Sequence, residues 1–348
     1  MASSHKTGGK RRPRPVVHAG KAKLRVHVAH AALTPPSQRV TLERLKAAAK
    51  AFPGTLRGLD ISYGDERTDF DRGLADAEAL IIGGYVDLDD LRRRAPRLKW
   101  VQSTSAGVEK AVPLMPAGVI LTNASGVHVP RGGEYGMTAV LMLNSRVPTF
   151  ATNQRKAHWE QHQTTPVAGK TLVILGVGSI GGEVARLAKR FGMRVLGVTR
   201  SGRPQRWVDR MYRQKDLAKV LPQADILLAV LPLTPETHGM LGRAELDLLP
   251  RHAGIVNVGR ARVIDYDALQ EKLRLGELSG AVLDVFYEEP LPADSPLWSA
   301  PNLIISPHCG IDDESVYIER CLAIFLDNVK RYRAGRPLRN VVDLKLGY

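Results

Sequence analysis

Residues 171–181 read TLVILGVGSIG, an apolar run that leads directly into the pattern Gly-x-Gly-x-x-Gly. In such a turn the first glycine permits a tight bend, the second lets backbone N–H groups approach a pyrophosphate, and the third lets a helix pack closely on a strand. A helix that begins here directs the positive end of its dipole at the anion. The stretch therefore predicts a strand, a turn and a helix that bind a dinucleotide through Gly176, Gly178, Ser179, Ile180 and Gly181.

Further apolar runs follow this stretch and are separated by helical or loop segments. They cover residues 194–198, 225–230, 254–258, 280–284 and 302–306. Runs that are nearly continuous in apolar residues are typical of parallel strands covered on both faces. With residues 171–175 they make six strands, the number that a doubly wound dinucleotide-binding sheet needs.

The part of the chain before the glycine loop predicts a second parallel α/β unit. Its apolar runs cover residues 24–29, 79–82, 98–102 and 119–121, and helix-like stretches such as 40–51 separate them. Long helices are expected over 134–146 and 314–333. Since the second of these follows the nucleotide-binding unit, we expect it to pack back onto the first domain, in a discontinuous two-domain chain with a cleft between its lobes.

Composition and charge narrow the class of protein. Hydrophobic residues make up 44% of the 348 residues, and no apolar run reaches the about 20 residues that span a bilayer. Only Cys309 and Cys321 are present, which excludes a disulfide framework and predicts a cytoplasmic protein without membrane association. The net charge of +15 owes much to residues 1–22, a basic, Gly- and Pro-containing segment that we expect to be disordered. A solvated tail is the preferred interpretation, a polybasic arm for acidic partners stays open, and nucleic acid is not the expected partner.

The end of the second strand of the nucleotide-binding unit indicates which cofactor binds. A site for NAD usually has Asp or Glu about 20 residues after the glycine loop, where this chain has Thr199, Arg200 and Ser201. Arg200 and Arg203 favour a 2′-phosphate through charge and bidentate hydrogen bonding, although two ordinary surface arginines would give the same pattern. The sequence thus predicts NADP(H), with NAD(H) as the alternative.

Polar residues follow three consecutive strands of the predicted sheet. They are Arg260 after residues 254–258, Glu289 after 280–284, and His308 after 302–306. Each one alone could be structural, as an ion pair, a loop acid or a turn histidine. Because ligands bind open α/β sheets at the carboxyl ends of the strands, we expect all three in one cleft.

With these segments, the chain from about Leu24 to Tyr348 resembles the D-isomer-specific 2-hydroxyacid dehydrogenases. The resemblance implies a Rossmann dinucleotide-binding domain (124–311) inserted into a flavodoxin-like substrate domain (23–123 and 312–348), both doubly wound, and a homodimer. It places the catalytic set on Arg260, Glu289 and His308, and the loop for the substrate carboxylate at Ala106 and Gly107, with Arg260. It implies that Asp284 meets the nicotinamide carboxamide. The further cofactor-binding positions are Leu231, Pro232, Thr237, Val258, Gly259, His308 and Gly310.

These residue types suit the reduction of a small 2-oxo acid, such as glyoxylate or hydroxypyruvate, to the D-2-hydroxy acid. His308 can donate a proton to the carbonyl oxygen, Glu289 can orient the imidazole, and Arg260 can hold the carboxylate. A phosphoglycerate dehydrogenase-like enzyme and a dinucleotide-sensing corepressor or scaffold on the same fold stay open. A formate dehydrogenase is disfavoured, because those relatives carry an amide at the position of Glu289.

Two stretches depart from the family pattern. Cys309 and residues 311–313 replace a small, glycine-rich run, and Gly133-Glu134-Tyr135 stands where Ala-Glu is common. These changes leave the substrate less certain than the reaction type. Cys309 is expected to be a small buried hydrophobe rather than a reactive thiol.

Overall fold

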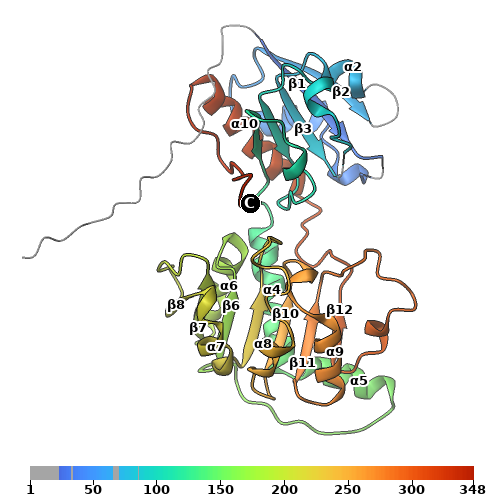
Figure 1. The fold of residues 1–348 in the computed structure, drawn as a ribbon, viewed down its shortest axis with the longest axis vertical. Helices are drawn as coiled ribbons and strands as arrows, with labels where there is room; N and C mark the ends of the chain where they lie inside the picture. The colour runs from blue at the N-terminus through green and yellow to red at the C-terminus, as the bar shows by residue number, and fades with distance from the viewer. Residues whose placement is uncertain (1–22, 33, 66–69, 85) are drawn as a thin grey trace, which may run out of the picture. The chain divides into compact units, whose positions relative to one another are not determined.

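The computed structural model describes residues 23–32, 34–65, 70–84 and 86–348, so the predicted tail 1–22 lies outside the described residues. The described chain forms two compact units (Figure 1). Unit 1 holds the residues up to Ala124 together with Ile318–Lys345, and unit 2 holds Ser125–Tyr317 and Leu346–Tyr348. The sequence predicted that the chain returns to the first domain at residue 312 and that all of 312–348 belongs to that domain. In the structure, residues 312–317 and 346–348 group with unit 2 instead.

Unit 1 is built on a five-stranded parallel sheet in the order β2-β1-β3-β4-β5. This order is the flavodoxin-like doubly wound arrangement. The strands are β1 (Leu24–His30), β2 (Leu59–Asp65), β3 (Ala79–Gly83), β4 (Trp100–Ser103) and β5 (Ile120–Thr122). The helices are α1 (Leu42–Ala49), α2 (Phe70–Leu74), α3 (Leu91–Arg94) and α10 (Tyr317–Arg333). Sequence analysis missed β2, because this edge strand reads LDISYGD and lacks a continuous apolar run.

Helix α10 packs on this sheet although it follows unit 2 in the sequence. The buried indole of Trp100 stacks on Phe325 with ring centroids 5.3 Å apart. Its Nε1 donates a hydrogen bond of 2.7 Å to the Thr122 hydroxyl on the neighbouring strand. Asn328 of α10 hydrogen-bonds through its amide nitrogen to Gln102 of β4 at 3.3 Å. The end of the chain therefore completes the first unit.

Unit 2 contains a seven-stranded parallel sheet in the order β12-β11-β10-β9-β6-β7-β8. The strands are β6 (Thr171–Leu175), β7 (Arg194–Thr199), β8 (Arg210–Arg213), β9 (Ile226–Ala229), β10 (Gly254–Asn257), β11 (Gly280–Leu283) and β12 (Leu303–Ile305). The helices are α4 (Val129–Asn144), α5 (Val147–Arg155), α6 (Ser179–Arg190), α7 (Leu217–Val220), α8 (Arg243–Asp247) and α9 (Tyr266–Arg274). The predicted fold class of two parallel-sheet α/β domains, one of them Rossmann-like, is confirmed. The prediction of six strands was incomplete, because β8 is an exposed edge strand with the polar sequence RMYR.

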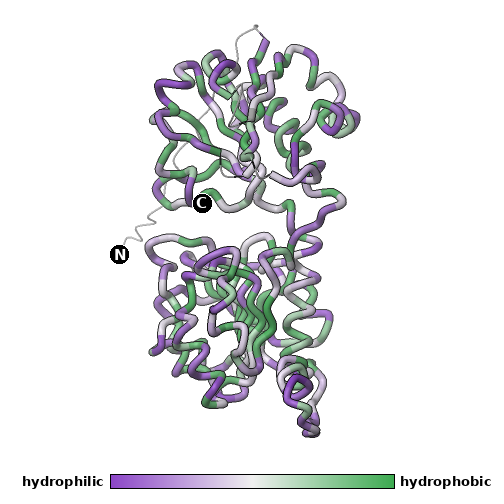
Figure 2. Tube along the Cα trace, turned by 90° about the vertical axis from the view of Figure 1, so that its right-hand side faces the viewer, coloured by the Kyte–Doolittle hydropathy of each residue, from purple (hydrophilic) through white to green (hydrophobic). Residues whose placement is uncertain are grey.

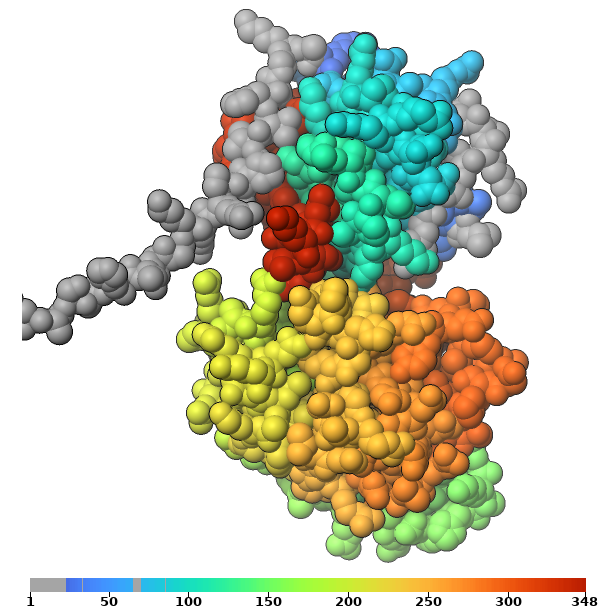
Figure 3. All heavy atoms as spheres, viewed as in Figure 1, coloured from blue at the N-terminus to red at the C-terminus, as the bar shows by residue number. Residues whose placement is uncertain are grey.

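Helices cover both faces of the sheet in unit 2. Side chains alternate along β6, so that Val173 and Leu175 join the core under α8 and α9 while Leu172 and Ile174 join the core under α4 and α6. The strands form the most hydrophobic band of this unit in Figure 2. In the space-filling view of Figure 3 the visible face of unit 2 changes from yellow through gold to orange across its width.

Helix α4 begins at Val129, five residues earlier than the predicted start at Glu134. Three glycines of α4, Gly132, Gly133 and Gly136, lie where α4 meets α6. A Cβ at Gly133 would lie 2.4 Å from Glu183 Cγ, and one at Gly136 would lie 2.7 Å from Val184 Cγ2. The glycines therefore permit close helix packing, which outweighs their low helix propensity.

Among the described residues, no helix combines the length and the hydropathy needed to cross a bilayer.

Candidate active site

The glycine loop joins β6 to α6 in the predicted conformation. Gly176 has a φ of +95°, and a Cβ there would lie 2.4 Å from the Val230 carbonyl oxygen. A Cβ at Gly181 would lie 2.2 Å from the Gly176 carbonyl oxygen, so the third glycine allows the helix to approach the turn. A Cβ at Gly178 would meet nothing within 4 Å. Among the described residues, no side chain caps the N-terminus of α6, whose first two residues are Ser179 and Ile180. The open loop and the uncapped helix N-terminus fit a pyrophosphate.

The turn after β7 holds the residues predicted to select the cofactor. The Thr199 hydroxyl accepts a hydrogen bond of 3.1 Å from Gly202 N, and the Ser201 hydroxyl accepts one of 3.4 Å from Arg203 N. The Arg200 guanidinium lies 5.7 Å from the centre of the Tyr348 ring. These contacts order the turn that carries Arg200 and Arg203.

A carboxylate that sequence analysis missed lies near Arg200. The pKa of Glu236 is lowered, first by a hydrogen bond from the Thr234 hydroxyl and also by the charge of Arg200. Glu236 comes from the loop after β9, and no spacing from the glycine pattern would have pointed to it.

The loops after β9 and β10 approach each other closely. The Thr237 hydroxyl donates to the Pro232 carbonyl oxygen at 2.7 Å and accepts from Thr234 N at 2.8 Å. A Cβ at Gly259, which follows Val258, would lie 2.7 Å from Leu231 N. Five predicted cofactor residues are thus brought together at the carboxyl ends of two adjacent strands: Leu231, Pro232, Thr237, Val258 and Gly259.

Asp284 lies fully buried after β11 and binds the loop that follows β12. Its Oδ1 accepts hydrogen bonds from the Ser306 hydroxyl (2.5 Å), Gly310 N (2.9 Å) and Cys309 N (3.2 Å). Burial raises the pKa of this carboxyl, and the bonds from its donors partly offset that effect. Its Oδ2 has no partner among the described residues. An unpaired buried carboxylate oxygen is costly, so a bound carboxamide N–H would fit it.

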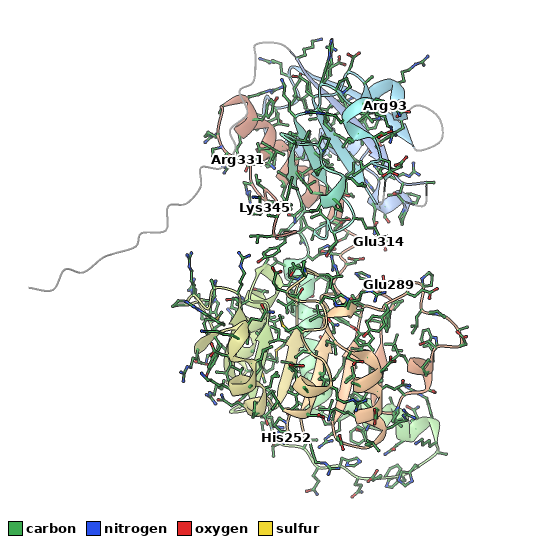
Figure 4. All side chains as sticks on the ribbon, viewed as in Figure 1. Arg93, His252, Glu289, Glu314, Arg331 and Lys345 are labelled. Atoms are coloured by element: carbon green, nitrogen blue, oxygen red, sulfur yellow. The ribbon has the colours of Figure 1, made fainter. Side chains whose placement is uncertain are left out.

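His308 and Glu289 form a direct pair. His308 Nδ1 and Glu289 Oε2 are 2.7 Å apart, and the other carboxylate oxygen accepts a hydrogen bond of 2.8 Å from Phe286 N. Figure 4 labels Glu289 at the opposite end of unit 2 from His252, which precedes β10. The carboxylate therefore fixes the imidazole through Nδ1 and leaves Nε2 as the nitrogen for a substrate.

Arg260 follows Gly259 and is also anchored. Its Nη1 donates to the Gly259 carbonyl oxygen at 2.8 Å, and its own carbonyl oxygen accepts from the Asn257 amide at 3.2 Å. His128 was not predicted as a site residue, because it belongs to no motif. Burial lowers the pKa of His128, Asp312 opposes this shift, and the charges of Arg260 and His308 lower it further. Arg260 and His308 thus both contribute to the electrostatic environment of His128, a residue of unit 2.

Ala106 and Gly107 belong to unit 1, whereas the other predicted site residues belong to unit 2. The Ala106 carbonyl oxygen accepts a hydrogen bond of 2.8 Å from the Asn123 amide.

The prediction that Cys309 is buried was wrong, because its side chain is exposed. Its pKa is raised, first by partial desolvation and then by Asp284 and Asp312, so the thiol is not activated.

Comparison with known proteins gives consistent matches. Residues 137–310 match the family model "D-isomer specific 2-hydroxyacid dehydrogenase, NAD binding domain". The chain is 36% identical to glyoxylate/hydroxypyruvate reductase B of Pectobacterium carotovorum, over 78% of this chain and 87% of that protein. It is 29% identical to D-3-phosphoglycerate dehydrogenase of Methanocaldococcus jannaschii, over 82% of this chain and only 55% of that protein. A similar fold is found in the crystal structure of an NADPH-dependent glyoxylate/hydroxypyruvate reductase from Sinorhizobium meliloti in complex with NADP and sulfate. The TM-score is 0.78 and the sequence identity 28%, and the match covers 94% of this chain and 100% of that one.

Proposed function

Because this chain belongs to the family of D-isomer-specific 2-hydroxyacid dehydrogenases, we propose that it reduces a small 2-oxo acid to the D-2-hydroxy acid, with NADPH as the preferred reductant. The family membership makes it an NAD(P)-dependent oxidoreductase. Glyoxylate and hydroxypyruvate are the proposed substrates, since relatives that are 32% and 36% identical over the aligned residues carry those names. The observation that carries the proposal is the 2.7 Å contact between His308 Nδ1 and Glu289.

The pair of His308 and Glu289 would supply the proton for the reduction. A bound nicotinamide supplies the hydride for the 2-oxo carbon. His308 donates from Nε2 to the carbonyl oxygen, while the carboxylate of Glu289 holds the ring and stabilises the protonated imidazole. Arg260 offers the substrate carboxylate a planar fork of donors and polarises the carbonyl. Ala106 and Gly107 stay predicted ligands of that carboxylate.

Arginines on the turn after β7 support the preference for NADPH. Arg200 and Arg203 stand where an NAD site would have an acidic residue for the ribose hydroxyls. The Sinorhizobium meliloti reductase, which was solved with NADP, adds support. NAD(H) is the alternative cofactor, and an unchanged rate on exchanging NADPH for NADH would contradict the preference.

Some proposals concern the setting of the protein rather than its chemistry. We infer a homodimer and a cytoplasmic location, for which family membership and the two free cysteines are the support. A phosphoglycerate dehydrogenase-like activity is the second candidate, favoured by the relative from Methanocaldococcus jannaschii.

The test is a comparison of initial rates of NADPH and NADH oxidation with glyoxylate, hydroxypyruvate, pyruvate and phenylpyruvate. 3-Phosphoglycerate with NAD is assayed alongside in the oxidative direction. Faster turnover of glyoxylate or hydroxypyruvate with NADPH is expected. Turnover of 3-phosphoglycerate alone would transfer the assignment to the second candidate. Dinucleotide binding without turnover of any of these acids would favour a sensor or scaffold role.

A further inference from the structure

A chain of hydrogen bonds joins helix α4 to the buried carboxylate of Asp284. The Tyr135 hydroxyl lies 2.5 Å from the Ser306 hydroxyl, which in turn lies 2.5 Å from Asp284 Oδ1. All three residues belong to unit 2, yet they come from α4, the loop after β12 and the loop after β11. The chain therefore ties three separate segments together next to the pair of His308 and Glu289.

The direction of this chain follows from the protons available. A serine hydroxyl has one proton, and Ser306 donates it to the Asp284 carboxylate. The short contact between the two hydroxyls then requires Tyr135 to donate to Ser306. Burial raises the pKa of Tyr135, so its hydroxyl keeps the proton that this role needs. The order of donation is Tyr135 to Ser306 to Asp284.

The hydrogen bonds that Asp284 accepts from the described residues converge on one of its two oxygens. Oδ1 accepts from Ser306, Cys309 N and Gly310 N, whereas Oδ2 is buried without a partner among the described residues. A carboxylate can rotate and exchange its oxygens unless its donors fix the plane of the group. Because the three donors all bind Oδ1, Oδ2 is the oxygen that stays available to a ligand.

The ring of Tyr135 contributes as well as its hydroxyl. A Cβ at Gly310 would lie 2.5 Å from the Tyr135 ring, so this glycine and the tyrosine fit directly against each other. Gly310 N is one of the donors to Asp284 Oδ1, and His308 lies two residues before it with a φ of +50°. Removal of the hydroxyl alone would keep this packing and interrupt only the hydrogen bonds.

We propose that Tyr135 is a positioning residue that acts through Ser306 to hold the Asp284 carboxylate with Oδ2 directed at the carboxamide NH₂ of the bound nicotinamide. The proposal rests on the proposed function, since it requires a nicotinamide dinucleotide. The proposal goes beyond that function by assigning a role to two further side chains, Tyr135 and Ser306, which act through Asp284. Selectivity for the carboxamide would then depend on a side chain of helix α4.

Equilibrium binding tests this without any turnover. Dissociation constants are measured by fluorescence titration for NADP⁺ and for its 3-acetylpyridine analogue, which has a methyl group in place of the carboxamide NH₂. The wild-type protein should prefer NADP⁺ by roughly tenfold, about the value of one hydrogen bond to a charged group. Tyr135→Phe should reduce that preference to about twofold or less and weaken NADP⁺ rather than the analogue. Ser306→Ala should have the same effect, and the double variant should add little to either single one.

Controls separate this role from a general structural one. Tyr332→Phe removes a tyrosine hydroxyl from α10 in unit 1 and should leave both dissociation constants unchanged. Thermal unfolding of each variant reports any loss of stability. A Tyr135→Phe protein that melts normally and keeps the wild-type preference would overturn the proposal, as would a wild-type protein that binds both dinucleotides equally. If the preference responds to Tyr135→Phe but no 2-oxo acid is reduced, the hydrogen-bond chain stands and the proposed function falls.

Discussion

The exchange of Glu289 for glutamine tests the role of the pair most sharply. In the structure Glu289 uses one oxygen for Phe286 N and the other for His308 Nδ1. A glutamine keeps its oxygen for Phe286 N and presents its NH₂ to the imidazole. His308 Nδ1 must then accept instead of donate, which removes both the orientation and the stabilisation of the protonated ring.

The magnitude follows from the bond that is lost. A hydrogen bond to a charged group contributes about 1.5–3 kcal/mol, so the reductive kcat should fall by roughly 10- to 150-fold. Because the hydrogen bonds of Glu289 go to His308 Nδ1 and Phe286 N, KM for the 2-oxo acid and the dissociation constant of NADPH should change less than threefold, on the order of 0.6 kcal/mol.

The assay is steady-state reduction of glyoxylate and hydroxypyruvate with NADPH, with a parallel titration of NADPH binding. Glu288→Gln is the matched control, since this exposed neighbour carries the same carboxylate. It should retain wild-type kcat. A Glu289→Gln protein with normal kcat, or one in which only KM changes, would refute the role given to the carboxylate.

Three further predictions concern the cofactor, the glycine loop and stability. Arg200→Asp should lower the ratio of kcat/KM for NADPH to kcat/KM for NADH by about tenfold, because a charge-assisted hydrogen bond to the 2′-phosphate is lost. The control is Arg206→Asp, which makes the same charge change at an arginine that stacks on Trp207 and should leave the ratio unchanged. In differential scanning calorimetry, Gly176→Ala should lower the unfolding midpoint by several degrees more than Gly169→Ala. Both glycines have positive φ, but only a Cβ at position 176 would meet a carbonyl oxygen. Equal midpoints for the two variants would refute the steric argument. Burial, with a smaller contribution from Arg39, lowers the pKa of His30 from 6.5 to about 4. Between these values the unfolded chain binds more protons, so the free energy of unfolding should fall as the pH drops from 6.5 to 4, by at most about 1.4 kcal/mol per pH unit from this group. His30→Gln should flatten that slope in urea titrations, and an unchanged slope would exclude His30 as its cause.

Sequence patterns predicted the strands with nearly continuous apolar runs and missed two strands that lack them. The runs of β6, β7, β9, β10, β11 and β12 are nearly continuous, and this holds even for the edge strand β12. The edge strands β2 and β8 mix polar and apolar residues. The start of α4 was missed for a different reason. Its glycines are explained only by the closeness of α6, a tertiary contact that no local pattern encodes.

The candidate site shows the same division between local and long-range information. The glycine loop, Arg260, Glu289 and His308 belong to motifs with fixed spacing, so they could be named before the structure was known. His128, Glu236 and the hydrogen-bond chain from Tyr135 to Asp284 depend on side chains that meet across long stretches of sequence. Ser306 is the last residue of the apolar run 302–306 that was predicted as a strand, and its two hydroxyl contacts could not be inferred from that position.

The most direct test of the central claim is the configuration and rate of the product formed from hydroxypyruvate and NADPH. Chiral chromatography of the glycerate made by the wild-type protein should show the D-enantiomer. His308→Gln should form it at least roughly 100 times more slowly, the scale of general acid–base catalysis, with NADPH still bound. L-glycerate from the wild-type protein, or D-glycerate from His308→Gln at the wild-type rate, would contradict the account.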